Sequence, residues 1–270
     1  MKKIKVAVVG ATGLVGRAFL KILEKSAVPV DGPVCFASER NEGKLIKFAG
    51  KHLEIKLLNE ENIKKYPCDY AFFAVSEDLA AAFAPVFVGT GATVIDNSSA
   101  HRMIDNIPLV VPEVNFGDIS GGDKIIANPN CSTIQCMLPL KALHDVFSLE
   151  KVVYTSFQAV SGSGTPGVED LRGTAAGRPP KFYPHPIFNN CLPHIGSFLP
   201  SGFTKEEEKM IKETQKILHL PKLPVSATCV RVPIENSHSV AVSAGFKNEI
   251  DLAAKATPSP PWRRAKTRCW

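Results

Sequence analysis

The sequence lacks the features that mark membrane, metal-binding and disulfide-rich proteins. It has no apolar run long enough to cross a membrane. Its seven cysteines are scattered, with no Cys-x-x-Cys pair and no Cys/His cluster at zinc spacing, so we expect neither a metal nor a disulfide framework. The basic residues 1–5 precede an apolar stretch that is too short for a signal peptide. Together these absences favour a protein of the reducing cytoplasm, with no membrane partner.

Excess positive charge is also scarce outside one short segment. The net charge is +6, but residues 251–270 carry +4 of it and leave only +2 for the first 250 residues. The basic character therefore belongs mainly to the end of the chain, and it gives no reason to expect a nucleic-acid partner. A length of 270 residues exceeds one typical core, so we expect two domains.

The first motif with chemical content follows the first predicted strand, residues 5–9. A glycine-rich turn at 10–16 comes next and opens a helical pattern that reaches residue 25. A strand, a glycine-rich turn and a helix in this order predict a dinucleotide site, although the spacing is GxxGxxG rather than the commoner GxGxxG. The alternative is a glycine-rich turn that binds nothing. The residues expected at the cofactor are Gly10, Thr12, Gly13, Leu14, Val15 and Gly16.

The end of the second predicted strand, residues 34–37, bears on the choice of cofactor. NAD enzymes usually place an acidic residue here to hold the ribose 2′-hydroxyl, whereas a hydroxyl or basic residue suits a 2′-phosphate. Ser38 and Arg40 therefore favour NADP. Glu39 is an opposing signal, and NAD is the alternative.

Two further strands are predicted at residues 69–75 and 93–96, with an alanine-rich helix from Asp78 between them. Strands that alternate with helices indicate an open parallel sheet, which binds ligands at the carboxyl ends of its strands. Arg102 follows the second of these strands, and its planar guanidinium suits a phosphate or a carboxylate. An exposed surface arginine is the alternative, and His101 is expected to be a bystander.

A cysteine motif lies at residues 128–132, between an apolar run at 124–127 and a periodic segment at 133–147. The run predicts a strand and the segment a helix. Cys131 then lies at a helix N-terminus, where backbone N–H groups and the helix dipole stabilise a thiolate and lower its pKa. This position predicts a nucleophile, and an inert buried cysteine is the alternative.

The second half of the chain begins with a long predicted strand at residues 151–160. A loop of small residues at 158–164 follows, in which Gln158 and Ser161 are able to hydrogen-bond a ligand. An ordinary flexible turn is the alternative. Residues 173–200 show little periodicity, and we expect an irregular connection there.

Residues 204–218 give the clearest helical pattern, and Thr204 with Glu207 predicts a capping box at its start. Glu206 falls on the rim of the apolar stripe, and Lys209 lies one step further toward the polar side. Both residues are placed to reach a site at the helix edge. The alternative is an ion pair on a solvated face.

Two more strands are predicted at residues 225–234 and 239–246, as parts of an antiparallel sheet. Alternation places Arg231 on the face opposite its apolar neighbours. His238 stands at the start of the last strand, so the two residues flank one turn. A histidine beside an arginine, in a chain with a candidate thiolate, is a candidate general acid or base, and a structural histidine is the alternative.

Together these segments resemble the aspartate-β-semialdehyde dehydrogenase family. They run in the family's order and cover nearly all of residues 1–246. The NPNCS motif and the Arg231/His238 pair are specific to the family, whereas the glycine-rich turn is shared with many reductases. The matching stretches are 10–16, 96–102, 128–133, 158–164, 204–210 and 231–239.

The resemblance implies an α/β fold with two domains. A Rossmann-type NADP-binding domain is expected over residues 1–130. A catalytic and dimerisation domain of α+β type, with a mixed, largely antiparallel sheet, is expected over 131–250. The implied reaction is NADPH-dependent reductive dephosphorylation of L-aspartyl 4-phosphate to L-aspartate 4-semialdehyde through a cysteine thioacyl intermediate. This step leads to lysine, threonine, methionine and, in bacteria, diaminopimelate. The implied assembly is a homodimer or homotetramer.

The resemblance also assigns roles to single residues. Cys131 is the nucleophile, His238 the general acid/base, and Gln158 the residue that positions the acyl group. The implied cofactor contacts in the second half of the chain are Ser161 and Gly162. The implied substrate-binding residues are Asn130, Arg231 for the α-carboxylate, Glu206 for the amino group, and Arg102 and Lys209 for phosphate.

The chain departs from the family pattern at residues 251–270. Family members continue for several tens of residues with further strands and a last helix, whereas this tail is rich in proline and arginine and shows no helical or strand period. We expect it to be disordered, and we expect the chain to carry the catalytic residues without part of the family's scaffold. A smaller departure is Ser237, where glycine is frequent. The alternatives are an inactive NADP-binding remnant and a related acyl-phosphate reductase such as N-acetyl-γ-glutamyl-phosphate reductase.

Overall fold

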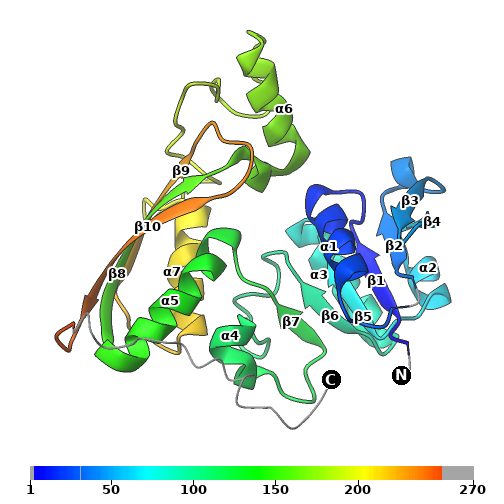
Figure 1. The fold of residues 1–270 in the computed structure, drawn as a ribbon, viewed down its shortest axis with the longest axis horizontal. Helices are drawn as coiled ribbons and strands as arrows, with labels where there is room; N and C mark the ends of the chain where they lie inside the picture. Colours follow the sequence, from blue (N-terminus) through cyan, green and yellow to red (C-terminus); the bar gives the residue numbers. More distant parts are fainter. Residues whose placement is uncertain (1–2, 31, 251–270) are drawn as a thin grey trace. The chain divides into compact units, whose positions relative to one another are not determined.

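A computed structural model describes residues 3–30 and 32–250 of the chain (Figure 1). The predicted irregular tail, residues 251–270, lies outside the described residues. Within the described ranges, no helix is both long and apolar enough to cross a membrane.

The chain divides into two compact units. The first contains the residues up to Leu109 together with the short stretch Ile119–Asn128. The second contains Val110–Asp118 and the described residues from Pro129 onward. Residues 110–118 thus belong to the second unit, although they precede the predicted domain boundary at residue 130.

The first unit is built on a sheet in the order β3-β4-β2-β1-β5-β6-β7. All neighbouring strands are parallel except β3, which pairs antiparallel with β4 at the edge. The order runs outward from β1 in both directions, so the chain leaving β1 lies at the switch point where such sheets bind ligands. The strands are β1 Val6–Val9, β2 Val34–Ala37, β3 Leu45–Phe48, β4 Lys51–Leu57, β5 Tyr70–Phe73, β6 Thr93–Asp96 and β7 Ile125–Ala127.

Helices cover both faces of this sheet because its central strands are apolar on both sides. In β1, Val6 and Val8 pack with Leu20 and Leu23 of α1, whereas Ala7 and Val9 belong to the core beneath α2 and α3. The helices of the first unit are α1 Leu14–Lys25, α2 Glu60–Lys65 and α3 Glu77–Gly89, with a 3₁₀ turn, η1, at Glu39–Asn41.

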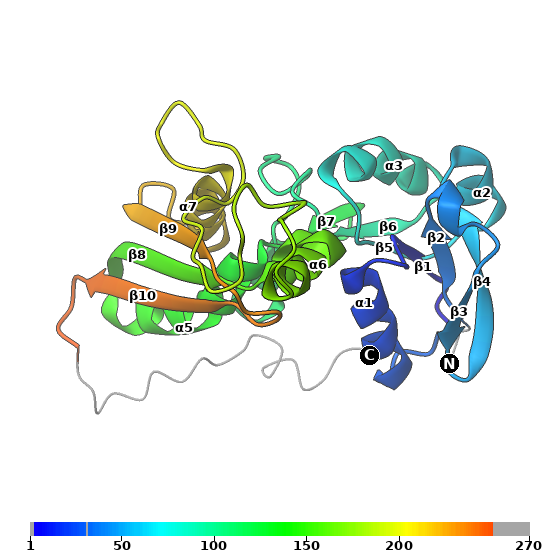
Figure 2. The same cartoon turned by 90° about the horizontal axis from the view of Figure 1, so that it is seen from above.

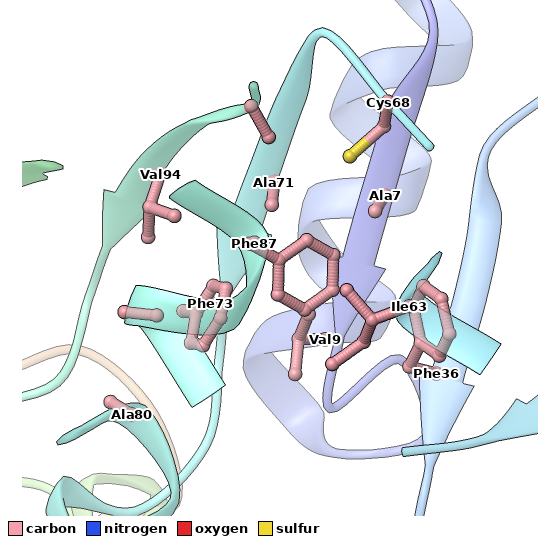
Figure 3. Close-up of a cluster of buried hydrophobic side chains, with 12 residues drawn as sticks. Ala7, Val9, Phe36, Ile63, Cys68, Ala71, Phe73, Ala80, Phe87 and Val94 are labelled. Atoms are coloured by element: carbon pink, nitrogen blue, oxygen red, sulfur yellow. The ribbon is translucent and has the colours of Figure 1, made fainter. Parts of the chain in front are cut away.

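Aromatic contacts anchor the core under α3. The ring of Phe87 meets Phe73 edge to face at 5.3 Å between ring centroids and Phe36 at 5.6 Å (Figure 3). The three rings come from α3, β5 and β2, so they tie one helix to two strands. Edge-to-face pairs add about 0.5–1.5 kcal/mol to the burial of the rings.

The second unit is built on a three-stranded sheet in the order β10-β8-β9. β9 is parallel to β8, and β10 is antiparallel to it. Helices α5 and α7 cover one face, against which β8 buries alternate residues (Figure 2). The strands are β8 Leu149–Gln158, β9 Val225–Arg231 and β10 Ser239–Phe246. The helices are α4 Pro112–Asn115, α5 Cys131–Phe147, α6 Gly164–Ala175 and α7 Lys205–Ile217, with 3₁₀ turns η2 Phe116–Asp118 and η3 Val160–Ser163.

Several predicted elements are confirmed with little change. β2, β6 and β10 have the predicted bounds, and α1 ends at the predicted residue. The capping box of Thr204 and Glu207 is present at the start of α7. The bounds of these elements follow from apolar periodicity, and the capping box follows from local hydrogen bonds. Both signals act over a short range of sequence.

Other elements differ from the sequence-based expectation. The segments 225–234 and 239–246 form strands but flank β8 on opposite sides instead of pairing with each other, and the mixed sheet has one parallel and one antiparallel pairing. The region expected to be irregular from residue 173 begins inside α6. Three glycines and a proline obscure the helical period of α6, although proline is tolerated in a first turn. The edge pair β3/β4 and helix α2 were not predicted.

Candidate active site

The glycine-rich turn after β1 is shaped by close approaches of the backbone. Gly10 has φ +85, and a Cβ there would overlap the carbonyl oxygen of Ala74. A Cβ at Gly16 would overlap the carbonyl oxygen of Gly10. α1 begins after Gly13 with no side-chain cap and no acidic residue in its first turn. A helix N-terminus of this kind is a site for an anionic group, and it fits the pyrophosphate of a dinucleotide.

The residues expected to select the cofactor lie beside this turn. Ser38 is the N-cap of η1, Arg40 lies within η1, and both are exposed. The side-chain amide of Asn41 donates to the Thr12 hydroxyl at 3.4 Å. This bond links the end of β2 to the glycine-rich turn, while Leu14 and Val15 at the start of α1 are exposed.

Arg102 is buried in the loop after β6. Its Nη2 donates to the carbonyl oxygen of Asn97 at 2.9 Å. Asp96 fixes the rest of the loop, because its carboxylate accepts from the Ser98 backbone N–H and hydroxyl and lies 2.6 Å from His101 Nδ1. His101 thus shapes the loop that carries Arg102, which gives a structural role to the residue expected to be a bystander.

Cys131 is the first residue of α5, as the sequence predicts, and it is exposed. Asn130 is the N-cap, and its side-chain oxygen accepts from the N–H groups of Ser132 at 2.7 Å and Thr133 at 3.4 Å. The N-cap forms because asparagine satisfies N–H groups that lack a partner within the helix.

Cys131 stands apart from most of the other cysteines of the described residues. Burial raises the pKa of Cys35, Cys68 and Cys136 to about 11 and that of Cys229 to about 12. A thiol with a raised pKa is a poor nucleophile at neutral pH because little of it is ionised. Of the described cysteines, Cys131 and Cys191 are exposed.

Helix α7 reaches the cysteine turn through Glu206, which is buried at its inner edge. Glu206 Oε1 accepts from Asn130 Nδ2 at 2.8 Å and from Gln158 Nε2 at 3.3 Å. Lys209 Nζ lies 3.7 Å from Glu206 Oε2. Two turns further along α7, Glu213 Oε2 accepts from the Asn130 backbone N–H at 2.6 Å. The structure therefore brings Asn130, Gln158, Glu206 and Lys209 together.

Arg231 and His238 both hydrogen-bond the backbone of Ala159. Arg231 Nη1 donates to the Ala159 carbonyl oxygen at 2.7 Å, and the Ala159 N–H donates to His238 Nδ1 at 2.9 Å. Both side chains pack on Gly162, where a Cβ would lie 2.9 Å from Arg231 Nη1 and 3.1 Å from His238 Nε2. Ser161, in the same 3₁₀ turn η3, donates its backbone N–H to the Glu235 carbonyl oxygen at 3.1 Å.

These contacts set the protonation state of His238. Burial lowers its pKa below the usual 6.5, the positive charge of Arg231 lowers it further, and Glu206 acts in the opposite direction. Because Nδ1 accepts an N–H, the neutral ring carries its proton on Nε2. His238 therefore offers an Nε2–H donor at neutral pH.

A cavity of about 460 Å³ in the second unit lies between α6 and residues 178–182. Its lining includes Arg172, Arg178, Lys181 and Phe182 and none of the residues described above. The candidate site is therefore identified by its polar contacts and not by a large cavity.

Known proteins are similar to this chain in sequence. The family profile described as Semialdehyde dehydrogenase, NAD binding domain, matches residues 5–121, and that described as Semialdehyde dehydrogenase, dimerisation domain, matches residues 140–258. The aspartate-semialdehyde dehydrogenase of Aquifex aeolicus is 48% identical over 256 residues, which cover 91% of this chain and 75% of that protein. The chain belongs to the aspartate-semialdehyde dehydrogenase family. It is an oxidoreductase of this type, and the predicted fold class is confirmed.

Solved structures of family members have a fold similar to that of this chain. Aspartate semialdehyde dehydrogenase II of Vibrio cholerae gives a TM-score of 0.87 at 40% identity, over 93% of this chain and 76% of that chain. A structure of the same Vibrio cholerae enzyme complexed with ASA gives 0.88 at 39% identity, with the same coverage. The enzyme of Candida albicans, solved with NADP, gives 0.72 at 27% identity, over 93% of this chain and 73% of that chain. The family's nucleotide-binding domain is therefore present here.

Sequence reasoning missed two members of the site. Glu213 lies seven residues after Glu206, so the helical period places both on one face of α7. That spacing was a usable signal, but the partner on the cysteine turn was not visible from it. The backbone N–H and carbonyl of Ala159 gave no signal, because a backbone group carries no residue type that marks its role.

Proposed function

We propose that the chain carries out the family's reaction as NADPH-dependent reductive dephosphorylation of L-aspartyl 4-phosphate to L-aspartate 4-semialdehyde, with Cys131 as the nucleophile. The observation that carries the proposal is the arrangement of Cys131 at the start of α5, with Asn130, Gln158 and Glu206 hydrogen-bonded beside it. A helix N-terminus stabilises a thiolate and an oxyanion that forms next to it.

The first half of the reaction is acyl transfer. The Cys131 thiolate attacks the acyl carbon, the C–O bond to phosphate breaks, and phosphate leaves with the bonding electron pair. The product is a thioester on Cys131. Backbone N–H groups at the start of α5 support the negative oxygen of the tetrahedral intermediate, and Gln158 positions the acyl group.

The second half is reduction. Bound NADPH supplies the hydride. Hydride addition leaves a thiohemiacetal oxyanion on Cys131; its C=O bond re-forms as the C–S bond breaks, which releases the aldehyde and the thiolate. His238 is the proposed proton carrier, because its Nε2–H is the ring group that Ala159 leaves available to hydrogen-bond this oxyanion and share its proton with it.

Two charged side chains suit the amino-acid part of the substrate. Arg231 is 5% exposed, and its Nε has no hydrogen-bond partner among the described residues. A buried donor without a partner is costly, so it favours a ligand that accepts, and a guanidinium binds a carboxylate through two parallel bonds. We assign the substrate α-carboxylate to Arg231 and the ammonium group to Glu206. The phosphate group is assigned to Arg102 and Lys209.

The cofactor proposal is NADP, held by Gly10, Thr12, Gly13, Leu14, Val15 and Gly16 and by Ser38 and Arg40; the assignment of Ser161 and Gly162 to the cofactor rests on the family resemblance alone. The tight glycine turn and the uncapped start of α1 support a dinucleotide, and the exposed Arg40, next in sequence to the Asn41 that bonds Thr12, supports a 2′-phosphate. Equilibrium binding of NADP and NAD to the same preparation tests the preference.

We also propose a cytoplasmic homodimer, with residues 131–250 as its catalytic and dimerising part. The face of the β10-β8-β9 sheet opposite α5 and α7 exposes Val153 and Phe157, and between these two positions the β9 and β10 residues paired with β8 are uncharged. An uncharged strand face of this kind favours burial against a second copy. Sedimentation equilibrium distinguishes a dimer from a tetramer and from a monomer.

The experiment that tests the nucleophile is site-resolved alkylation with iodoacetamide, read by peptide mass mapping. Cys131 is expected to react much faster than the other six cysteines, and aspartate semialdehyde with phosphate is expected to protect it. Uniform slow labelling would contradict a preorganised thiolate. It would favour the alternative of an inactive NADP-binding remnant, whereas turnover of the N-acetylglutamyl analogue in place of the aspartyl one would favour a related acyl-phosphate reductase.

A further inference from the structure

Glu213 is a buried acidic residue that the proposed reaction does not use. It is 1% exposed and lies in the middle of α7, on the same face as Glu206. Its Oε2 accepts from the Asn130 backbone N–H at 2.6 Å. Because a buried carboxyl group needs polar partners, this contact is a specific one and not a by-product of packing.

Asn130 is the residue on which the position of Cys131 depends. Its side-chain oxygen caps α5, its side-chain amide donates to Glu206, and its backbone N–H donates to Glu213. Glu206 thus accepts from the side-chain amide of Asn130 and Glu213 from its backbone N–H, and the two glutamates lie two turns apart on α7. A residue held at both its backbone and its side chain has little freedom to rotate.

The backbone contact has a distinct consequence for the nucleophile. The Asn130 side chain fixes the first turn of α5, but the direction in which the chain enters that turn depends on the peptide group before Asn130. Without Glu213 this buried N–H needs another acceptor, and the turn has to shift to provide one. Cys131 follows directly, so a shift of the turn moves its Sγ relative to the groups that act with it.

We propose that Glu213 is a positioning residue for Cys131, acting through the Asn130 backbone N–H. The proposal rests on the proposed function of Cys131 as nucleophile. Glu213 is assigned no chemical step of the reaction. Position 213 requires a hydrogen-bond acceptor at the end of a side chain as long as that of glutamate. Glutamine meets this requirement and should preserve the position of Cys131. Leucine lacks the acceptor and aspartate is too short, so neither should preserve it.

The test compares Glu213→Gln, Glu213→Leu and Glu213→Asp with a matched control on the next residue, Thr214→Val. Thr214 is equally buried on α7, and its hydroxyl bonds Met210 and Tyr154 and not the cysteine turn. Each variant is measured for melting temperature, for kcat and KM in the reverse reaction, and for the alkylation rate of Cys131. The rate is divided by that of exposed Cys191 in the same sample.

For Glu213→Leu we expect kcat to fall about 100-fold, which is the usual effect of displacing a reacting group by about 1 Å. Its KM should stay close to that of the wild type, and the Cys131/Cys191 alkylation ratio should fall. Glu213→Gln should restore both kcat and the ratio. Thr214→Val should lower the melting temperature and leave kcat and the ratio unchanged.

A purely structural role gives a different result. If Glu213→Leu lowers the melting temperature as Thr214→Val does while kcat and the alkylation ratio stay at wild-type values, the proposal is wrong. If Glu213→Leu does not fold, Glu213→Asp decides, because it keeps the charge and withdraws the acceptor; unchanged kcat and ratio there overturn the proposal. The alkylation ratio needs no turnover, so a failure of the proposed function is seen separately in the wild type.

Discussion

Replacing Gly162 with alanine is the most informative single change in the site. The added Cβ would lie 2.9 Å from Arg231 Nη1, 3.1 Å from His238 Nε2 and 3.1 Å from His238 Cε1. Gly162 itself has no left-handed backbone, so the substitution acts through these contacts and not through backbone strain. It therefore displaces the proposed carboxylate-binding group and the proposed proton carrier together.

The magnitude follows from the overlap. Most Cβ contacts in proteins are at least 3.4 Å, so the two side chains have to retreat by about 0.3–0.5 Å. Displacement by about 1 Å costs about 100-fold in rate, and half that displacement corresponds to about tenfold in kcat/KM. Both side chains have flexible or rotatable ends, so we expect the overall fold to be retained.

The assay is steady-state kinetics of the reverse reaction, with KM determined separately for aspartate semialdehyde, phosphate and NADP. Gly173→Ala is the matched control. A Cβ at Gly173 meets Arg178 at 3.7 Å, an ordinary contact, and Gly173 lies within α6, where alanine stabilises a helix by about 1 kcal/mol. The control should be slightly more stable than the wild type and fully active.

Two results would refute this reasoning. Gly162→Ala with wild-type kinetics would mean that Arg231 and His238 do not occupy the positions described here during turnover. A rise in KM for NADP alone would mean that Gly162 acts through the cofactor, as its sequence-based assignment implies, and not through the two side chains.

Three further predictions concern single groups. The acidic limb of kcat/KM should lie below pH 6.5, because burial and Arg231 lower the pKa of His238, and His238→Asn should remove this limb. Ser237→Gly should raise stability to urea by about 0.5–1 kcal/mol, because Ser237 has a left-handed φ of 76°. Asp170→Asn should lower stability to urea by about 2 kcal/mol at pH 7, because the carboxylate accepts from the backbone N–H groups of Lys181, Phe182 and Tyr183.

Each of these predictions has a contrary outcome. A kcat/KM limb above pH 7 that depends on His238 would contradict the direction of its pKa shift. A less stable Ser237→Gly variant would mean that the serine side chain contributes more to stability than the left-handed backbone conformation of this residue costs. For Asp170, burial raises the pKa but the three N–H groups outweigh it, so the native pKa lies below 3.8. The carboxylate's contribution to stability is present above pH 3.8 and is lost as the pH falls through the native value. An unchanged urea midpoint for the asparagine variant at pH 7 would show that the contribution is absent.

The parts of the site that are local in sequence were predictable. An asparagine followed by a periodic segment is sufficient to place Cys131 at a helix start, and Thr204 with Glu207 is sufficient to start α7. The glycine-rich turn is also local, because Gly10 and Gly16 approach residues that the strand–turn–helix order already brings near. In these cases the physical cause lies within a few residues of its effect.

The parts that depend on distant contacts were not predictable. Glu213 and Asn130 are 83 residues apart, and nothing in either segment specifies their hydrogen bond. The strands β9 and β10 have clear apolar alternation, but alternation fixes the face of a strand and not its neighbour, so their insertion on either side of β8 was missed. Helix α6 was missed because its glycines and proline oppose the helical period, and contacts made by Asp170 with the segment after it help to hold it in place.

The most direct test of the central claim is the phosphate-dependent reduction of NADP by aspartate semialdehyde, measured for the wild type and for Cys131→Ala. We predict turnover by the wild type that requires phosphate, and no turnover by a variant that still binds NADP. Equal turnover by both proteins would contradict the assignment of Cys131 as the nucleophile. Absence of turnover in a wild type that binds NADP would contradict the proposed reaction.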